Sequence, residues 1–216
     1  MLLTRIVLAS TSPRRYDLLR SLGLAVDVLR SGYDEPPLTD VTPAELASRH
    51  ADEKLRFALR NGAATFGAPV LAADTVVDLD GIALGKPADA AEAARMLERL
   101  SGRMHAVHTA FALALPGAAQ AAVAERETTR VRFFELKPDE IAEYVATGEP
   151  LDKAGAYGIQ GRAASLVAGI DGDFYTVMGL PLARVIRALR RSGFALPKPN
   201  ECSPFLPTET NADSSR

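Results

Sequence analysis

Two adjacent arginines, Arg14 and Arg15, lie in the first turn of a predicted helix, directly after an apolar run at residues 6–9. This placement is electrostatically unfavourable, because the first turn of a helix carries partial positive charge and unpaired N–H groups. A bound anion in front of this turn would offset both. The pair therefore indicates a phosphate-binding site, and solvated surface charges are the alternative interpretation.

The residues around the arginines support a helix that begins at an anion site. Ser12 suits the N-cap and Pro13 fits the first helical position. A strand, a short polar loop at residues 10–12 and a helix N-terminus together resemble a phosphate seat. Neither the dinucleotide-binding glycine fingerprint nor the Walker loop occurs in the sequence. The predicted phosphate-binding site is therefore neither a dinucleotide-binding loop nor a Walker loop.

Length and composition indicate an ordinary globular protein. The chain has 216 residues, of which 47% are hydrophobic and 24% are charged. These values are close to the globular average and allow one substantial core. We therefore expect one domain over residues 1–195. The remaining residues are rich in Pro, Ser, Thr and Asn with few apolar side chains, which predicts a disordered tail over residues 196–216.

Charge and cysteine content exclude several classes of function. A formal net charge of −2 gives no electrostatic reason to bind a nucleic-acid polymer. The single cysteine, Cys202, excludes an internal disulfide and a cysteine-rich zinc site. The sequence has no signal-peptide-like start, and no apolar stretch approaches the roughly 20 residues that cross a bilayer. We expect a cytoplasmic protein that does not bind membranes.

Strands and helices alternate early in the sequence, and strands dominate its middle. Proline and capping residues mark predicted helix starts at or next to Pro13, Pro43, Asp89, Pro138 and Pro181. Apolar runs predict strands at residues 6–9, 25–29, 69–78, 82–84, 105–115 and 121–136. This order predicts an α/β fold in which flanking helices pack on one long, mixed and twisted sheet.

Asp74 interrupts an apolar run at residues 70–77 that reads as a central strand. Burying an ionised carboxylate costs several kcal/mol unless a cation or hydrogen bonds compensate it. A functional site is the simplest compensation. A structural aspartate paired with an arginine or a backbone turn is the alternative.

Two further segments carry charged residues that could meet Asp74. Lys86 follows the predicted hairpin and could bind phosphate, although a solvated loop lysine is the commoner explanation. Residues 148–161 combine glycines and alanines, which permit close approach of the backbone to a ligand, with Asp152, Lys153 and Gln160. These side chains supply an acceptor, a cation and an amide that could read a base.

Histidines and serines give no sign of other common chemistries. His105 and His108 lie on a predicted strand, where a spacing of three residues places them on opposite faces. We therefore interpret them as structural residues or as residues that support the site, rather than as a metal-binding pair. The sequence contains neither a serine nucleophile elbow nor the zinc-protease motif, which argues against acyl transfer and zinc proteolysis.

Several segments, taken in order, resemble the Maf family of nucleotide pyrophosphatases over about residues 5–193. They are Leu-Ala-Ser-Thr-Ser-Pro-Arg-Arg at residues 8–15, Ala-Asp-Thr-Val-Val at 73–77, Gly-Lys-Pro at 85–87, Leu-Ser-Gly at 100–102 with His105, Val107 and Thr109, the loop at 152–161, and Gly-Leu-Pro-Leu at 179–182. The resemblance implies a fold related to inosine-triphosphate pyrophosphatases, with two lobes around a substrate cleft. It also implies hydrolysis of a nucleoside triphosphate between its α and β phosphates, assisted by a divalent metal.

The resemblance assigns roles to residues at matching positions. Asp74 is implied as the proton acceptor that activates the attacking water. The implied cofactor is Mg²⁺ or Mn²⁺, and its implied ligands are Glu35, Asp74 and Asp152. Phosphate contacts are implied for Ser10, Arg14, Arg15, Lys54, Lys86 and Lys153.

Substrate preference is read from Arg14, Thr75 and Gln160, which resemble the branch of the family that acts on dTTP and UTP. A glutamine amide both donates and accepts, which suits the O4 and N3–H edge of uracil or thymine. One alternative is a pyrophosphatase of the same fold for 7-methyl-GTP or a non-standard purine. Another is a regulatory binding protein of septum formation, an association that the family's name suggests. The resemblance also suggests a homodimer.

Overall fold

The computed structural model of the chain describes residues 1–36 and 40–198. Its strands are β1 (Arg5–Leu8), β2 (Ala25–Val28), β3 (Val70–Leu79), β4 (Ile82–Leu84), β5 (Met104–Ala114), β6 (Val123–Phe133) and β7 (Val167–Asp171). Its helices are α1 (Pro13–Arg20), α2 (Pro43–Arg60), α3 (Ala90–Leu100), α4 (Pro138–Ala146), α5 (Phe174–Met178) and α6 (Leu182–Arg191). Short 3₁₀ helices lie at Ala63–Phe66, Glu149–Asp152, Ala154–Ala156 and Arg162–Leu166.

The strands form one seven-stranded mixed sheet in the order β2-β1-β3-β5-β6-β7, and β4 lies off this path and pairs with β3. β1 is parallel to β2 and β3, whereas β3, β5, β6 and β7 pair antiparallel. The predicted α/β class and the long mixed sheet are therefore confirmed.

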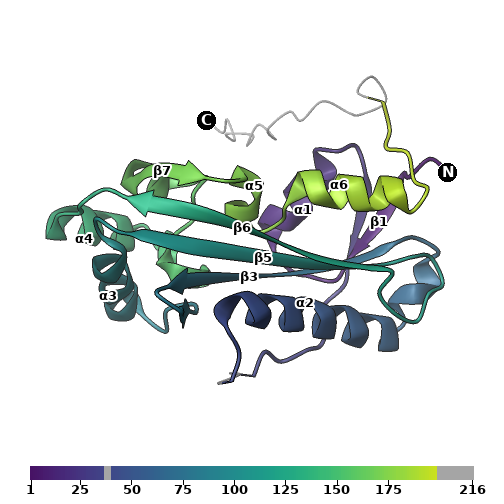
Figure 1. The fold of residues 1–216 in the computed structure, drawn as a ribbon, viewed down its shortest axis with the longest axis horizontal. Helices are drawn as coiled ribbons and strands as arrows, with labels where there is room; N and C mark the ends of the chain where they lie inside the picture. The colour runs from purple at the N-terminus through teal and green to yellow at the C-terminus, as the bar shows by residue number, and fades with distance from the viewer. Residues whose placement is uncertain (37–39, 199–216) are drawn as a thin grey trace, which may run out of the picture.

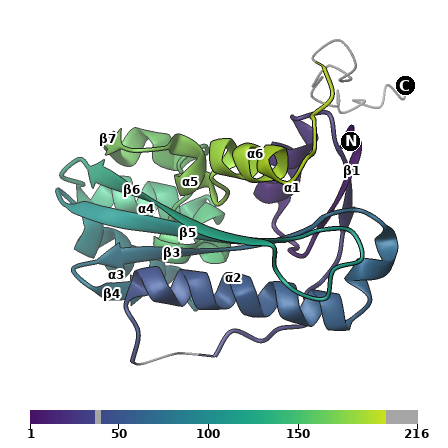
Figure 2. The ribbon, with the colours of Figure 1, turned by 45° about the vertical axis from the view of Figure 1, so that its right-hand side comes forward.

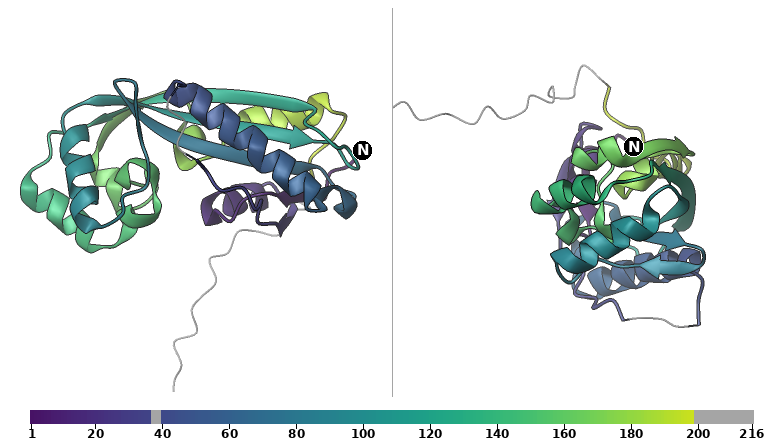
Figure 3. Two further views of the ribbon diagram at one scale, coloured as in Figure 1. Left: turned by 90° about the horizontal axis from the view of Figure 1, so that it is seen from below. Right: turned by 90° about the vertical axis from the view of Figure 1, so that its left-hand side faces the viewer.

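Helices cover both faces of the sheet (Figure 1). α2 lies under one face along β3 and β5, while α1, α5 and α6 lie on the other face (Figures 1 and 2). α3, α4 and the 3₁₀ helices of residues 149–166 form a second lobe at the far end, and the long strands extend into it (Figure 3). The predicted two lobes are thus present, and both are built on the same sheet.

Burial along the strands follows from these layers. β3 is almost entirely buried, because helices or the second lobe cover both of its faces. Its alternate side chains enter different cores: Ala72 and Val76 pack with α2, whereas Leu71 and Ala73 pack with α1 and α6. β6 alternates between exposed residues and half-buried or buried ones, as a strand with one covered face should.

The predicted helix starts are confirmed, with one difference in the capping contacts. Thr42 and Glu45 form a reciprocal capping box at α2, and Asp89 accepts from the backbone N–H of residue 92 at α3. Ser12 occupies the N-cap of α1, but its side chain makes no capping bond. Instead its backbone N–H donates to Ser10 Oγ at 3.2 Å.

Strand and helix boundaries differ from the sequence prediction in the second half of the chain. The strand expected at residues 121–136 is shorter and runs over Val123–Phe133. β7 and α5 were not predicted, because each has only five residues and both lie in a glycine-rich stretch with weak periodicity. The predicted tail lies outside the described residues from position 199 onward.

His105 lies in the core of the second lobe. Its ring makes edge contacts with Phe133 and Tyr157, and its Nε2 lies 2.8 Å from the Tyr157 hydroxyl. His108 instead contacts Thr128 Oγ1 at 2.9 Å and Asp78 Oδ2 at 3.1 Å. The two histidines share none of these partners, and both are buried in the fold. Burial lowers the pKa of His105 to about 4.

The shifted pKa of His105 predicts acid sensitivity of the fold. Between about pH 6.5 and pH 4 the unfolded chain binds a proton at this residue and the folded protein does not, so stability falls as the pH is lowered through this window. The lowered pKa of His105 reduces the free energy of unfolding by about 3 kcal/mol once the pH is below this window. Urea unfolding should show a smaller loss of stability between about pH 7.5 and pH 4.5 for His105→Gln than for the unmodified protein. Equal losses would contradict the prediction.

Candidate functional site

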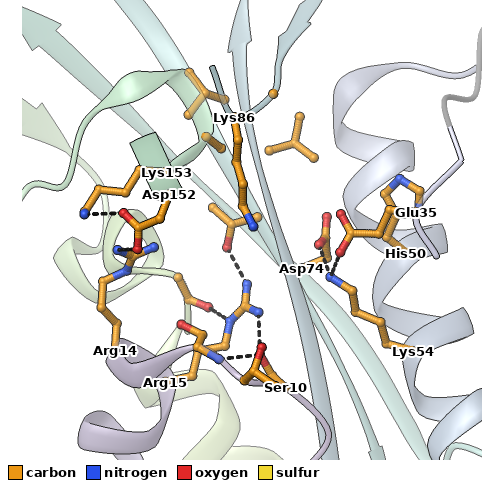
Figure 4. A pocket seen from close by; sticks show the side chains of 18 of the residues that line it. Ser10, Arg14, Arg15, Glu35, His50, Lys54, Asp74, Lys86, Asp152 and Lys153 are labelled. Atoms are coloured by element: carbon orange, nitrogen blue, oxygen red, sulfur yellow. Dashed lines mark hydrogen bonds and ion pairs between the residues drawn. The ribbon is translucent and has the colours of Figure 1, made fainter. Parts of the chain in front are cut away.

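A cleft of about 1040 Å³ opens between the two lobes. Every residue that the sequence assigned to the site lines it: Ser10, Arg14, Arg15, Glu35, Lys54, Asp74, Thr75, Lys86, Asp152, Lys153 and Gln160. These residues come from segments that are distant in the sequence, and Figure 4 shows most of their side chains facing one space. The fold therefore brings the predicted site residues together, and their individual roles stay predictions.

The cleft follows an unpaired stretch along one edge of β3. β1 pairs with β3 only at Val70 and Leu71, and β4 joins the same strand from Val77 onward. Between these two partners, residues 72–76 of β3 pair with β5 on their other edge alone among the described strands. Asp74 and Thr75 lie in this gap. Because successive side chains of a strand point to opposite faces, they reach the cleft from two sides.

Lys54 binds two carboxylates at once. Its Nζ lies 2.6 Å from Asp74 Oδ1 and 2.6 Å from Glu35 Oε1. The Lys54 and Asp74 side chains are only 11% and 8% exposed, whereas the Glu35 side chain is 50% exposed. The capped helix α2 supplies the ammonium that compensates the buried aspartate. Asp74, which the sequence predicted to need a compensating charge, is therefore paired with Lys54. Lys54 also lines the cleft.

Two cleft carboxyls have lowered pKa values, for similar reasons. Burial opposes ionisation of Glu35, but the hydrogen bond and charge of Lys54 outweigh it and hold the pKa of Glu35 below its ordinary value. At Asp152 burial likewise opposes ionisation, and the hydrogen bond and charge of Lys153, with the charge of Arg14, lower the pKa. Both side chains are therefore anionic at neutral pH.

Arg15 is held by three acceptors from different elements. Its Nε donates to the Gly179 carbonyl at 2.7 Å, Nη1 donates to Ser10 Oγ at 3.1 Å and Nη2 donates to Thr75 Oγ1 at 3.0 Å. The residue is 8% exposed, and burial lowers the pKa of its guanidinium. A guanidinium has five N–H groups, so these bonds leave others for a ligand. Arg15 thus links three segments of the fold by hydrogen bonds and is also a candidate anion ligand.

Arg14, Lys86 and Lys153 line the same cleft. Arg14 Nη1 lies 3.9 Å from Asp152 Oδ2 on the wall of the second lobe. Lys153 Nζ donates to Asp152 Oδ1 at 2.6 Å and to the Glu149 carbonyl at 2.7 Å. Figure 4 shows Lys86 reaching into the cleft between this wall and Asp74. An anion in the cleft would therefore meet positive charge on several sides.

The glycines of the 148–161 loop make room for side chains of the loop itself. A Cβ at Gly158 would lie 2.5 Å from Lys153 Cε, and one at Gly161 would lie 2.5 Å from both Glu149 carboxylate oxygens. The sequence predicted close approach of this backbone to a ligand. In the structure these two glycines accommodate Lys153 and Glu149, and so fix the lysine against the loop.

The predicted metal ligands fall into two groups. Glu35 and Asp74 both contact Lys54 Nζ, which occupies the point where they meet, and they offer the hard oxygen donors that Mg²⁺ and Mn²⁺ prefer. Asp152 instead pairs with Arg14 and Lys153. Within residues 1–36 and 40–198 no group of three or more His, Cys, Asp or Glu side chains is arranged to hold a metal ion. The oxygen donors of Glu35 and Asp74 are of the type that suits a divalent cation, and the metal itself stays a prediction.

Comparison with known proteins agrees with this geometry. A family model described as Maf-like protein matches residues 5–192. The chain belongs to the Maf family. A protein of Symbiobacterium thermophilum named dTTP/UTP pyrophosphatase is 50% identical over 89% of this chain and 96% of its own length. A protein of the same name from Thermus thermophilus is 49% identical over 88% of this chain and 95% of its own length.

Among solved structures, a HAM1 protein from Coxiella burnetii overlaps 88% of this Maf chain and 100% of its own, at 21% identity and a TM-score of 0.47. The family model and the sequence relatives carry the family assignment. None of the helices in the described part of this Maf protein is both long enough and apolar enough to cross a membrane.

Sequence reasoning missed two residues of this Maf protein that line the cleft beside Lys54. Tyr33 and His50 both face it, and the Tyr33 hydroxyl lies 3.1 Å from His50 Nδ1. His50 lies one helical turn before Lys54, so the spacing of four residues could have placed both on one face of α2. Tyr33 lies in an irregular loop, where no periodicity marks the direction of a side chain.

The contact between Gly158 and Lys153 predicts a selective loss of anion binding. In Gly158→Ala the new Cβ would displace the flexible Lys153 side chain, while the fold persists because only that side chain must move. Calorimetry should show affinity for inorganic triphosphate weakened about tenfold, the value of one charge-assisted contact. Gly169→Ala is the matched control, since its Cβ would have no neighbour closer than 3.9 Å. Equal affinities of the two variants would contradict the prediction.

Proposed function

We propose that this Maf protein is a nucleoside triphosphate pyrophosphatase that hydrolyses dTTP and UTP to the monophosphate and pyrophosphate. One observation carries the proposal: the Asp74–Lys54–Glu35 cluster and the cations Arg14, Arg15, Lys86 and Lys153 line the same cleft. An acidic cluster next to converging cations suits an anionic substrate that is attacked by water. The names of the relatives support this substrate class.

The cations would bind the triphosphate and orient it. Arg15 is already fixed by Ser10, Thr75 and Gly179, so its remaining N–H groups point in set directions. Such preorganised donors stabilise the charge that develops in phosphoryl transfer, where positioning and electrostatics do most of the catalytic work. Lys153 and Lys86 would add charge along the chain of phosphates. Gln160 would read the pyrimidine edge, because its amide donates and accepts.

Asp74 would take the proton from the attacking water. Lys54 bonds Oδ1 of Asp74, which leaves Oδ2 for the water. As the proton moves to Oδ2, the water oxygen forms a bond to the α-phosphorus. The bond between this phosphorus and the bridging oxygen breaks, and the electron pair leaves with pyrophosphate. Lys54 would hold the Asp74 carboxylate in place for this step.

Glu35 and Asp74 would hold the divalent cation of the proposal. When bound, such a cation neutralises phosphate charge and polarises phosphoryl oxygens. Asp152, the third ligand implied by the family resemblance, pairs with Arg14 and Lys153 in this structure and would orient those cations. A cytoplasmic location and a homodimer complete the proposal, and both stay predictions.

A panel of nucleoside triphosphates tests the proposed reaction. Pyrophosphate release should be fastest with UTP and dTTP, slower with CTP and the purine nucleotides, and each turnover should give one monophosphate. Asp74→Asn should lower kcat about 10²- to 10⁴-fold, the usual contribution of a general base. Asp78→Asn, on the same strand and outside the cleft lining, is the control and should retain activity. Fastest turnover of 7-methyl-GTP or another purine would overturn the substrate assignment.

Removal of divalent cations should abolish hydrolysis. The acidic pair at the cleft consists of hard oxygen donors, so excess EDTA should stop pyrophosphate release, and Mg²⁺ or Mn²⁺ should restore it. Glu35→Gln should raise the metal concentration required for half-maximal rate. Undiminished turnover in the chelator would disprove the metal requirement and leave the substrate panel interpretable.

A further inference from the structure

A chain of hydrogen bonds runs from Arg15 across two strands to helix α5. Arg15 Nη2 lies 3.0 Å from Thr75 Oγ1 on β3, and this oxygen lies 2.9 Å from Thr109 Oγ1 on β5. Thr109 Oγ1 lies 2.7 Å from the carbonyl oxygen of Thr176. Thr109 and Thr176 are fully buried. The chain therefore connects the cleft to the interior without a break.

The direction of every bond in this chain follows from the number of hydrogens. A carbonyl oxygen can only accept, so the single hydroxyl hydrogen of Thr109 goes to Thr176. Thr109 Oγ1 must then accept from Thr75, which uses the single hydrogen of that hydroxyl as well. Thr75 Oγ1 accepts in turn from the Arg15 guanidinium. Thr75 consequently has no hydrogen left to donate to a nucleotide.

The chain closes into a ring through Gly179. The Gly179 N–H donates to the Thr176 carbonyl at 3.1 Å, and the Gly179 carbonyl accepts from Arg15 Nε at 2.7 Å. Gly179 has a φ of 114°, a conformation that side-chain-bearing residues rarely adopt. Arg15 is thus fixed at Nε and Nη2 by one ring, which sets the plane of its guanidinium.

We infer that Thr109 is a positioning residue for Arg15, and that Thr75 influences the substrate through Arg15 instead of by donating its own hydroxyl hydrogen. This inference rests on the proposed function in one respect, namely that Arg15 contacts the triphosphate. The ring itself stands on the contacts above. It gives a physical route by which the half-buried Thr75 and the buried Thr109 control an arginine at the cleft without donating a hydroxyl hydrogen to the nucleotide.

Thr109→Val tests the inference, because it removes the hydroxyl and keeps the branched shape. Thr75 then loses its acceptor, and Arg15 loses a fixed partner. We expect kcat/KM for UTP to fall about five- to tenfold, the effect of one buried hydrogen bond. Thr109→Ser keeps the hydroxyl and should stay within about twofold of the unmodified protein. In the Thr75→Val background, Thr109→Val should have almost no further effect, because its partner is already gone.

Thr129→Val is the matched control. Thr129 is also fully buried, and its hydroxyl donates at 2.8 Å to the carbonyl of Asp173, the N-cap of the same helix α5. Both valine variants therefore lose one hydroxyl-to-carbonyl bond to α5 and should lower Tm by similar amounts. Only Thr109 connects to Arg15 through this ring. Thr129→Val should keep kcat/KM within about twofold.

A second readout does not depend on hydrolysis. In protein with ¹⁵N-labelled arginine, the buried Nε–H of Arg15 should exchange slowly with water. Thr109→Val and Thr75→Val should shift this signal and speed its exchange, and Thr129→Val should leave it unchanged. Failure to hydrolyse UTP with this NMR pattern intact would refute the proposed function alone. Three results would overturn the inference. The Nε–H signal could be unperturbed in both Thr109→Val and Thr75→Val, or Thr109→Val and Thr129→Val could lose equal activity. The third is that the losses of Thr75→Val and Thr109→Val add up in the double variant.

Discussion

The burial of one carboxylate in the central strand is the constraint on which the site depends. Asp74 is 6% exposed and would be strongly destabilising without a nearby cation. Lys54 supplies this cation from α2, and it also holds Glu35 from the loop before that helix. The capping box that begins α2 and the alanines that pack it on the sheet position this ammonium group.

The alternation of side chains along β3 explains how one strand organises two kinds of chemistry. Asp74 points to the face covered by α2 and meets Lys54, while Thr75 points to the opposite face and meets Arg15. Because β1 stops short of this point and β4 begins beyond it, the strand edge between them is open to the cleft. A buried carboxylate and a guanidinium can therefore face one cleft from two sides of a sheet.

Much of this architecture could be predicted from local sequence patterns. The Arg14–Arg15 pair, the charged residue within the apolar run of β3 and the capping residues of α2 and α3 each carry a recognisable signal. The pairing of Lys54 with Asp74 could not be predicted in this way, since it depends on the packing of α2 across β3. The same holds for the direction of the threonine chain, which requires the position of a backbone carbonyl in the short helix α5.

A crystal structure with α,β-methylene-UTP and Mg²⁺ would test most directly whether the buried acid and the cations act on one triphosphate. We expect the α-phosphorus to face the free oxygen of Asp74, phosphate oxygens to bind Arg15 and Lys153, and Lys54 to remain bonded to Asp74. A triphosphate bound outside the cleft, or bound within it with the α-phosphorus turned away from Asp74, would contradict the account.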